Sequence, residues 1–342
     1  MTDADDSQVD TSGVDIGRLL EHVEELILGG PRKYTPAEVS DAAEVDRDEA
    51  RRLWRALGFP VVDDDDVVFT DGDVGALRTM RELSAQGLAD EDVRLAIARL
   101  FGRTFSRLAS YQGQLLLQQI TEHPEVLESD EGVDELVRSI LPLVEELQNY
   151  AWRRQLAAYV ARMAAQGDAD VASGPARLAI GFADMSRFTS LTRKSTEAEL
   201  RTLLDTFETF ATEIVGQNGG RIVKTIGDEV LFQTDDPASA VEIALQLLEV
   251  AAEHKELPEM RAGLALGEVV SRLGDVYGST VNIASRLTSI ARPGWVLVDR
   301  ELYAELEDDE RFRFKARRPE SVRGFHRLYS WRVTRGAPDG RR

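Results

Sequence analysis

Cysteine is absent from the chain, which excludes a disulfide framework, a thiolate metal site and a catalytic thiol. The sequence also lacks a run of roughly 18 or more apolar residues, so it predicts no transmembrane segment. Residues 1–13 are acidic and polar, without the basic and apolar regions of a signal peptide. We therefore expect a cytoplasmic protein that begins with a disordered acidic tail over residues 1–13.

Basic residues are scarce in the first half of the chain. The 342 residues carry a net charge of -20, and residues 1–172 contain 35 acidic but only 17 basic side chains. Residues 173–342 are close to balanced, with 26 acidic and 24 basic side chains. Because binding to phosphates needs a basic face, we expect no nucleic acid as a partner. The asymmetry also favours a chain of two parts.

Two kinds of pattern divide the chain. Apolar residues recur at helical spacing through residues 14–166, whereas strands and helices alternate after Pro175, with strands expected at 261–266 and 327–333 among others. Glycine, aspartate and proline residues favour a linker at 167–175. The sequence thus predicts an all-α first domain over residues 14–166 and an α+β domain over residues 176–335.

Part of the first domain resembles a MerR-type helix-turn-helix. The matching pieces are YTPAEVSDAAEVDRDEARRLWRALGF and FTDGDVGALRTMRELSAQGL. The region that would meet DNA, from Asp46 to Trp54, mixes acidic with basic side chains, and four aspartates occupy 63–66, where a wing would approach phosphates. We therefore interpret this segment as a packing module. A transcription regulator that senses nucleotide is the alternative.

Carboxylates stand at the ends of two expected strands in the second half. An apolar strand over 176–183 is followed by Asp184, and a hairpin over 221–234 turns at Asp228. A carboxylate beside free backbone N–H groups suits a hard cation and a polyphosphate. Taken singly, Asp184 is an ordinary capping residue and Asp228 an ordinary turn residue.

A further segment runs from Asp275 to Leu287 and begins a helix near Ser279. Asn282 and Arg286 are four residues apart, so they project from the same face of that helix. On their own these two polar residues describe a solvated helix face.

Together these segments resemble the catalytic domain of class III nucleotidyl cyclases, specifically adenylyl cyclases, which has a ferredoxin-like α+β fold. The likeness runs from about Ala176 to Val333. The first half resembles the regulatory domain that precedes this catalytic domain in soluble actinobacterial cyclases. The resemblance implies two divalent cations per site, Mg²⁺ or Mn²⁺, and a homodimer with shared active sites.

The resemblance also assigns roles to residues. Two aspartates would bind the metals, two residues would read the purine, and two would stabilise the transition state: Asp184 and Asp228, Lys224 and Asp275, and Asn282 and Arg286. Substrate binding would further involve Phe188, Thr189 and Arg323, and Arg323 stands where the family has a lysine.

Donors and acceptors favour ATP as the substrate. Asp275 can accept from the adenine amino group, and Lys224 can donate to N1. Guanine presents the reverse pattern, so a guanylyl cyclase is the alternative.

The regulatory signal is expected to be protons or a lipid. His22 and His123 lie in the strongly acidic first half and titrate near neutral pH. We therefore expect acidification to shift the enzyme towards its active state. The apolar helix over 95–117 predicts either a lipid pocket or core packing.

Overall fold

The computed structural model describes residues 16–87, 90–122, 130–166, 176–254, 257–272 and 274–336. The chain divides into two compact units, residues 1–166 and 167–342. The expected tail at 1–13, the expected linker at 167–175 and His123 lie outside the described residues. None of the described helices is long and apolar enough to cross a membrane.

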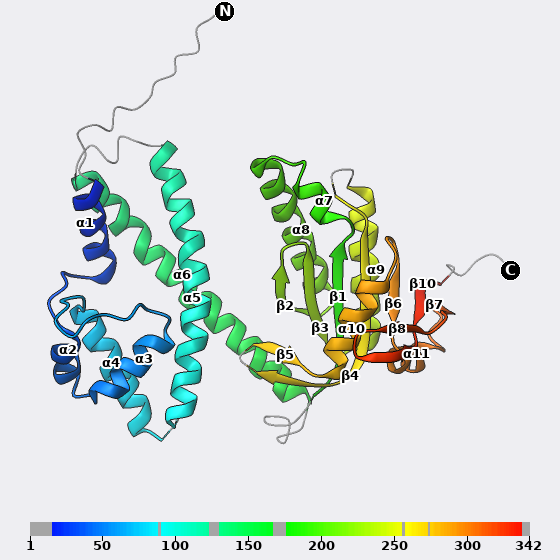
Figure 1. Ribbon diagram of the computed structural model, residues 1–342, viewed down its shortest axis with the longest axis horizontal. Helices are drawn as coiled ribbons and strands as arrows, with labels where there is room; N and C mark the ends of the chain where they lie inside the picture. Colours follow the sequence, from blue (N-terminus) through cyan, green and yellow to red (C-terminus); the bar gives the residue numbers. More distant parts are fainter. Residues whose placement is uncertain are drawn as a thin grey trace, which may run out of the picture. The chain divides into compact units, whose positions relative to one another are not determined.

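The first unit consists of helices (Figure 1). They are α1 (Ile16–Leu28), α2 (Pro36–Ala43), α3 (Arg47–Ala56), α4 (Asp71–Ala85), α5 (Glu91–Glu122) and α6 (Asp130–Gln166). Thr35 and Glu38 form a capping box at the start of α2, with Pro36 in its first turn. A bridge between Tyr34 and Phe69 closes the loop that precedes α4.

Helices α2 to α4 enclose a small core of Val39, Ala43, Phe69 and Val74. The longer helices are less covered. On α5, four apolar side chains are 45% to 62% exposed: Phe101, Phe105, Tyr111 and Leu115. The prediction of core packing along residues 95–117 is therefore wrong for these side chains. A helix of this length contacts its neighbours along only part of its surface.

The second unit is an α+β domain, as predicted (Figure 1). Its helices are α7 (Phe188–Thr192), α8 (Glu197–Gln217), α9 (Pro237–Glu253), α10 (Ser279–Ile290) and α11 (Arg300–Leu306). Its strands are β1 (Ala176–Met185), β2 (Arg221–Ile226), β3 (Glu229–Thr234), β4 (Met260–Arg272), β5 (Asp275–Tyr277), β6 (Val296–Val298), β7 (Phe312–Ala316), β8 (Glu320–Val322), β9 (Phe325–Leu328) and β10 (Trp331–Arg335).

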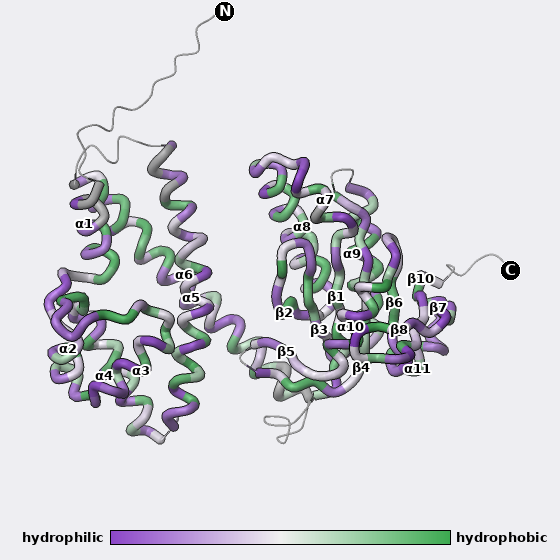
Figure 2. The backbone as a smooth tube through the Cα atoms, in the orientation of Figure 1, coloured by the Kyte–Doolittle hydropathy of each residue, from purple (hydrophilic) through white to green (hydrophobic). Residues whose placement is uncertain are grey.

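Eight of the described strands form one sheet in the order β2-β3-β1-β4-β6-β10-β7, with β5 paired to β4, and β8 and β9 form a separate two-stranded sheet. Strand β1 is antiparallel to both of its neighbours, β3 and β4. Its alternate residues enter different cores: Ala179 and Ala183 pack with α8, α9 and α11, whereas Ile180 and Phe182 pack on the α10 side. Hydrophobic colour follows these central strands in Figure 2.

The sequence prediction missed several elements. The strand expected at 261–266 continues to Arg272 and turns back as β5. The strand expected at 327–333 is two strands, β9 and β10, interrupted at Ser330, whose carbonyl accepts a hydrogen bond from the Arg317 backbone. Alternation alone does not reveal such a break, because the residues on either side keep strand-forming character.

Candidate functional site

Asp184 and Asp228 meet where β1 pairs with the β2–β3 hairpin. Asp184 lies opposite Glu229 in the ladder, and the Met185 N–H donates to the Asp228 carbonyl at 3.2 Å. The hairpin turns at Gly227, whose φ of 62° is readily adopted by glycine. Sheet pairing and turn geometry thus place the two carboxylates together, as the sequence suggested.

The carboxyl groups at this site repel one another. Burial raises the pKa of Asp228 to about 6, and the charge of Asp184 and a side-chain hydrogen bond with it act in the same direction. Burial also raises the pKa of Glu229 to about 7, reinforced by the charges of Asp184 and Asp228. A divalent cation relieves this kind of repulsion, and carboxylate oxygens are the ligands that Mg²⁺ and Mn²⁺ prefer.

Arg261 is a residue that the sequence analysis missed. It lies directly opposite Asp184 in β4, and its Nε and Nη2 donate to Asp184 Oδ2 at 2.9 and 2.7 Å. Its Nη1 also donates to the Ser289 carbonyl in α10 at 3.2 Å. This fork fixes the Asp184 carboxylate in one orientation. The available signal was its position at the start of the expected strand at 261–266, but the contact also needs the register of β4 against β1.

Lys224 and Asp275 form an ion pair. The Lys224 Nζ on β2 donates to Asp275 Oδ2 on β5 at 2.6 Å. Burial acts to raise the pKa of Asp275, but the Lys224 hydrogen bond and charge, with the Val276 N–H, lower it below its usual value. The lysine and aspartate side chains stay 37% and 26% exposed, so a ligand can reach both groups.

Asn282 and Arg286 lie on α10, four residues apart as predicted. Strand β4 has glycine at 263, where a Cβ would lie 2.2 Å from the Thr288 backbone nitrogen, so this glycine allows α10 to pack closely on the sheet. The Asn282 side chain is exposed and that of Arg286 is half-buried. Neither side chain forms an ion pair or a hydrogen bond with another described residue.

The other candidate residues are spread over two segments. Arg323 is exposed at the turn between β8 and β9, beside Gly324 with its φ of 91°. Phe188 starts α7 and packs partly against the main core. Thr189 belongs to the same helix, but its side chain lies outside the described residues.

The candidate residues fall into separate groups. No hydrogen bond or ion pair between described residues joins Asp184 or Asp228 to Lys224, Asp275, Asn282 or Arg286. Among the described residues, no group of three or more histidine, aspartate or glutamate side chains is placed to hold a metal ion. The aspartate pair therefore fits a cation that takes its remaining ligands from water and substrate phosphates, as Mg²⁺ commonly does.

Comparison with known proteins gives the chain its family. Residues 173–335 match the adenylate and guanylate cyclase catalytic domain, and residues 11–156 match the adenylate cyclase regulatory domain. An adenylate cyclase of Streptomyces coelicolor is 45% identical over 285 residues, which are 83% of this chain and 74% of the relative. This chain belongs to the adenylate cyclase family. The resemblance and the fold expected from the sequence are thereby confirmed.

Other relatives span most of the chain. An adenylate cyclase of Glutamicibacter nicotianae is 36% identical and covers 93% of this chain and 83% of its own length. A pH-sensitive adenylate cyclase of Mycobacterium tuberculosis is 32% identical and covers 91% and 81%. The adenylyl cyclase CyaB of P. aeruginosa is a structural neighbour with a TM-score of 0.44 and 23% identity, covering 49% of this chain and 99% of its own.

In the segment that resembles a helix-turn-helix, three arginines of α3 pair with carboxylates of the same unit. On α3, Arg47 contacts Asp41 at 3.0 Å, Arg51 contacts Asp64 at 2.9 Å, and Arg52 contacts Glu91 at 2.9 Å. Because these carboxylates already pair with the arginines of α3, they compete with DNA phosphates for the same positive charges.

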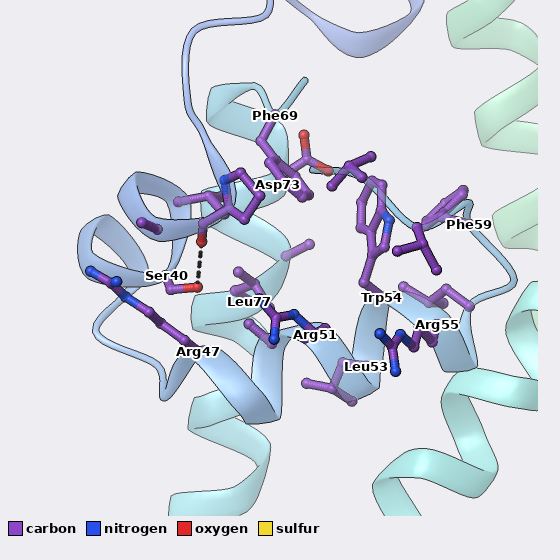
Figure 3. A pocket seen from close by; sticks show the side chains of 18 of the residues that line it. Ser40, Arg47, Arg51, Leu53, Trp54, Arg55, Phe59, Phe69, Asp73 and Leu77 are labelled. Carbon is purple, nitrogen blue, oxygen red and sulfur yellow. Dashed lines mark hydrogen bonds between the residues drawn. The ribbon is translucent and has the colours of Figure 1, made fainter. Parts of the chain in front are cut away.

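A cavity of about 430 Å³ lies between α2, α3, α4 and the loop before α4. Figure 3 shows Trp54, Phe59 and Phe69 on one part of its wall and Arg47 and Arg51 on another. None of its lining residues comes from the stretch 95–117, where the sequence suggested a lipid pocket.

Proposed function

We propose that this cyclase converts ATP to 3′,5′-cyclic AMP and pyrophosphate. The ribose 3′-oxygen attacks the α-phosphorus and forms a new P–O bond. The bond from the α-phosphorus to the oxygen that bridges to the β-phosphate breaks, pyrophosphate leaves with that oxygen, and the hydroxyl proton passes to water. The observation that carries the choice of ATP is the half-buried but accessible Lys224–Asp275 pair, which offers one donor and one acceptor to a purine edge. That pattern complements adenine and opposes guanine.

Asp184 and Asp228 are the residues that would hold two divalent cations. When bound, such cations lower the pKa of the 3′-hydroxyl and neutralise the phosphates. Arg261 holds Asp184 in place, so the site needs little rearrangement to accept metal.

The other residues act by positioning and by charge. Asn282 would hold the ribose in line, and Arg286 would meet charge that develops on the α-phosphate. Arg323 would approach the terminal phosphates, and the turn at Phe188 and Thr189 would contribute to their binding. None of these roles requires a covalent bond between the substrate and the protein.

Two copies of the chain would build each active site. One chain would supply the two metal-binding aspartates. Its partner would supply the Lys224–Asp275 pair together with Asn282 and Arg286. Support comes from the absence of contacts between these groups among the described residues, and from an exposed apolar face on α6. On that helix Leu143 and Leu147 are 65% and 66% exposed, a suitable surface for a second copy.

The first unit would control this activity through protons. His22 on α1 lies 2.6 Å from Asp134 on α6, and Asp134 also pairs with Arg138. An imidazolium in this contact would add charge attraction to the Asp134 carboxylate and tighten α1 against α6. The name of the pH-sensitive relative agrees with this idea. The apolar part of the cavity between α2, α3 and α4 favours a lipid as a second candidate effector.

The deciding experiment measures cyclic AMP formed from ATP by the full chain with Mg²⁺ or Mn²⁺ between pH 5 and 8. We expect product with ATP, at least tenfold less cyclic product with GTP, and activity that rises on acidification. Arg286→Ala should abolish turnover, while Arg300→Gln should not. Absence of product with either metal across this range would contradict the proposal, and a flat pH profile would contradict control by protons.

A further inference from the structure

Cationic side chains gather around one indole ring in the part of the sheet formed by β6, β10 and β7. Trp295 precedes β6, and the Cζ atoms of Arg317, Arg332 and Arg292 lie 4.5, 4.8 and 5.1 Å from its ring centroid. An indole has two faces, so at least two of these guanidinium groups share one face. We use the name arginine cluster for these three arginines together with Lys315 of β7, which lies opposite Arg332.

Strand register adds the fourth cation. Arg332 lies directly opposite Lys315 of β7 and directly opposite Leu297 of β6. Residues opposite one another in antiparallel strands point to the same side, with Cβ atoms roughly 5 Å apart, and like charges there are destabilising. Leu297 packs in the hydrophobic group that includes Leu287 of α10, so the arginine cluster lies on the α10 side of the sheet.

Little negative charge balances these cations. Among the described residues, Glu320 is the one carboxylate in ion-pair range of the arginine cluster, with its Oε1 3.4 Å from Arg317 Nη2. The Nε atoms of Arg317 and Arg332 are buried and lack an acceptor. Both guanidinium groups lie over the Trp295 ring, and this contact offsets part of the cost of burying the two Nε atoms. The Nη groups are then the donors that a ligand can use.

We propose that the arginine cluster binds a phosphate-class oxyanion at a site separate from the catalytic residues. A tetrahedral oxyanion with two negative charges can accept from two guanidinium forks at once and offsets the repulsion between Lys315 and Arg332. Rotamers already held by the indole lose little entropy on binding. The chemistry fits inorganic phosphate, pyrophosphate and the phosphates of a nucleotide.

The site joins two catalytic segments. Arg292 follows α10, which carries Arg286, and Arg317 precedes the β8–β9 hairpin, which carries Arg323. A bound anion would cross-link these segments. This consequence depends on the proposed function, whereas binding of the anion does not.

The test is a calorimetric titration of the full chain, without divalent cations, with inorganic phosphate, pyrophosphate or ATP. Arg332→Gln and Lys315→Gln should each weaken binding at least tenfold. Arg300→Gln serves as the matched control, because Arg300 stacks alone on Tyr329 at 4.9 Å. An Arg286→Ala, Arg323→Ala double variant isolates binding at the arginine cluster, and near-UV circular dichroism checks folding.

We expect the double variant and Arg300→Gln to retain binding. We expect Lys315→Gln and Arg332→Gln to lose it. Binding of phosphate alone supports a phosphate site, and tighter binding of pyrophosphate or ATP identifies a chain of phosphates as the ligand. Unchanged affinity in the folded Lys315→Gln and Arg332→Gln variants would overturn the proposal. So would loss of all binding in the double variant, or no binding of any of the three anions.

Discussion

Lys224 and Asp275 are 51 residues apart in sequence, yet the lysine Nζ lies 2.6 Å from the aspartate Oδ2. The contact exists because β5 turns back along β4 and brings Asp275 to the β2 edge of the sheet. A donor and an acceptor with fixed spacing are what discrimination between two purines requires, since each purine edge carries its own pattern.

Replacing this lysine should relax the choice of base. Lys224→Met keeps most of the side-chain length but removes the charged donor. We expect kcat/KM for ATP to fall about 10- to 100-fold, the usual cost of one charged hydrogen bond. The rate with GTP should fall less, so the ATP-to-GTP ratio of kcat/KM is the measurement. Lys33→Met in the first unit is the control, and an unchanged ratio in Lys224→Met would count against base reading.

Mixing two inactive variants tests whether the active site is shared. Asp184→Ala removes a metal-binding candidate, and Asn282→Ala removes a ribose-positioning candidate. Each alone should be nearly inactive. Random exchange in an equal mixture makes half the dimers mixed, each with one intact site, so about one quarter of the parent activity should return. A site contained within one chain would give no recovery.

Asp228 should favour function at the expense of stability. Asp228→Asn removes a carboxylate held beside Asp184, so we expect the variant to lose cyclase activity at least 100-fold. Without metal it should be at least as stable as the parent at pH 7, because the like-charge repulsion is gone. Thermal unfolding is the measurement, with the exposed Asp205→Asn as control. Added Mn²⁺ should raise the Tm of the parent more than that of Asp228→Asn.

Asp299 should make stability depend on pH. It is only 5% exposed, and burial raises its pKa to about 6. The folded state therefore binds a proton that the unfolded state has lost between about pH 4 and 6, and this contribution to stability is lost as pH rises through that window.

The Asp299→Asn variant tests this dependence. Its amide keeps an oxygen for the Leu302 and Leu266 N–H groups, which contact Asp299 Oδ1 at 2.9 and 3.4 Å in the parent. Relative to the parent, the variant should gain about 2 kcal/mol between pH 4 and pH 7. Chemical denaturation at both pH values measures the gain. A constant difference between the two proteins would show that Asp299 does not titrate in this window.

Much of the site could be predicted from sequence because its residues lie at the ends of regular elements. Asp184 ends an apolar strand, Asp228 stands at a hairpin turn, and Asn282 and Arg286 share a helix face through their spacing of four. Local periodicity and turn chemistry determine such positions, whatever packs around them.

Arg261, Glu229 and the arginine cluster could not be predicted in the same way. Arg261 contacts Asp184 through the register of β4 against β1, and Arg332 meets Trp295 through the pairing of β10 with β6. Register depends on which faces become buried when the whole sheet forms, and one residue of slip would reverse each of these contacts.

The two-part organisation, the acidic character of the first half, the order of the main helices and strands, and the motifs of the cyclase family can all be read from the sequence. Which side chains meet depends on the folded arrangement of the sheet: Lys224 with Asp275, Asp184 with Arg261, and the arginine cluster with Trp295. Chain-local forces act over a few residues, whereas these contacts join segments tens of residues apart, whose positions are set by burial of the shared core.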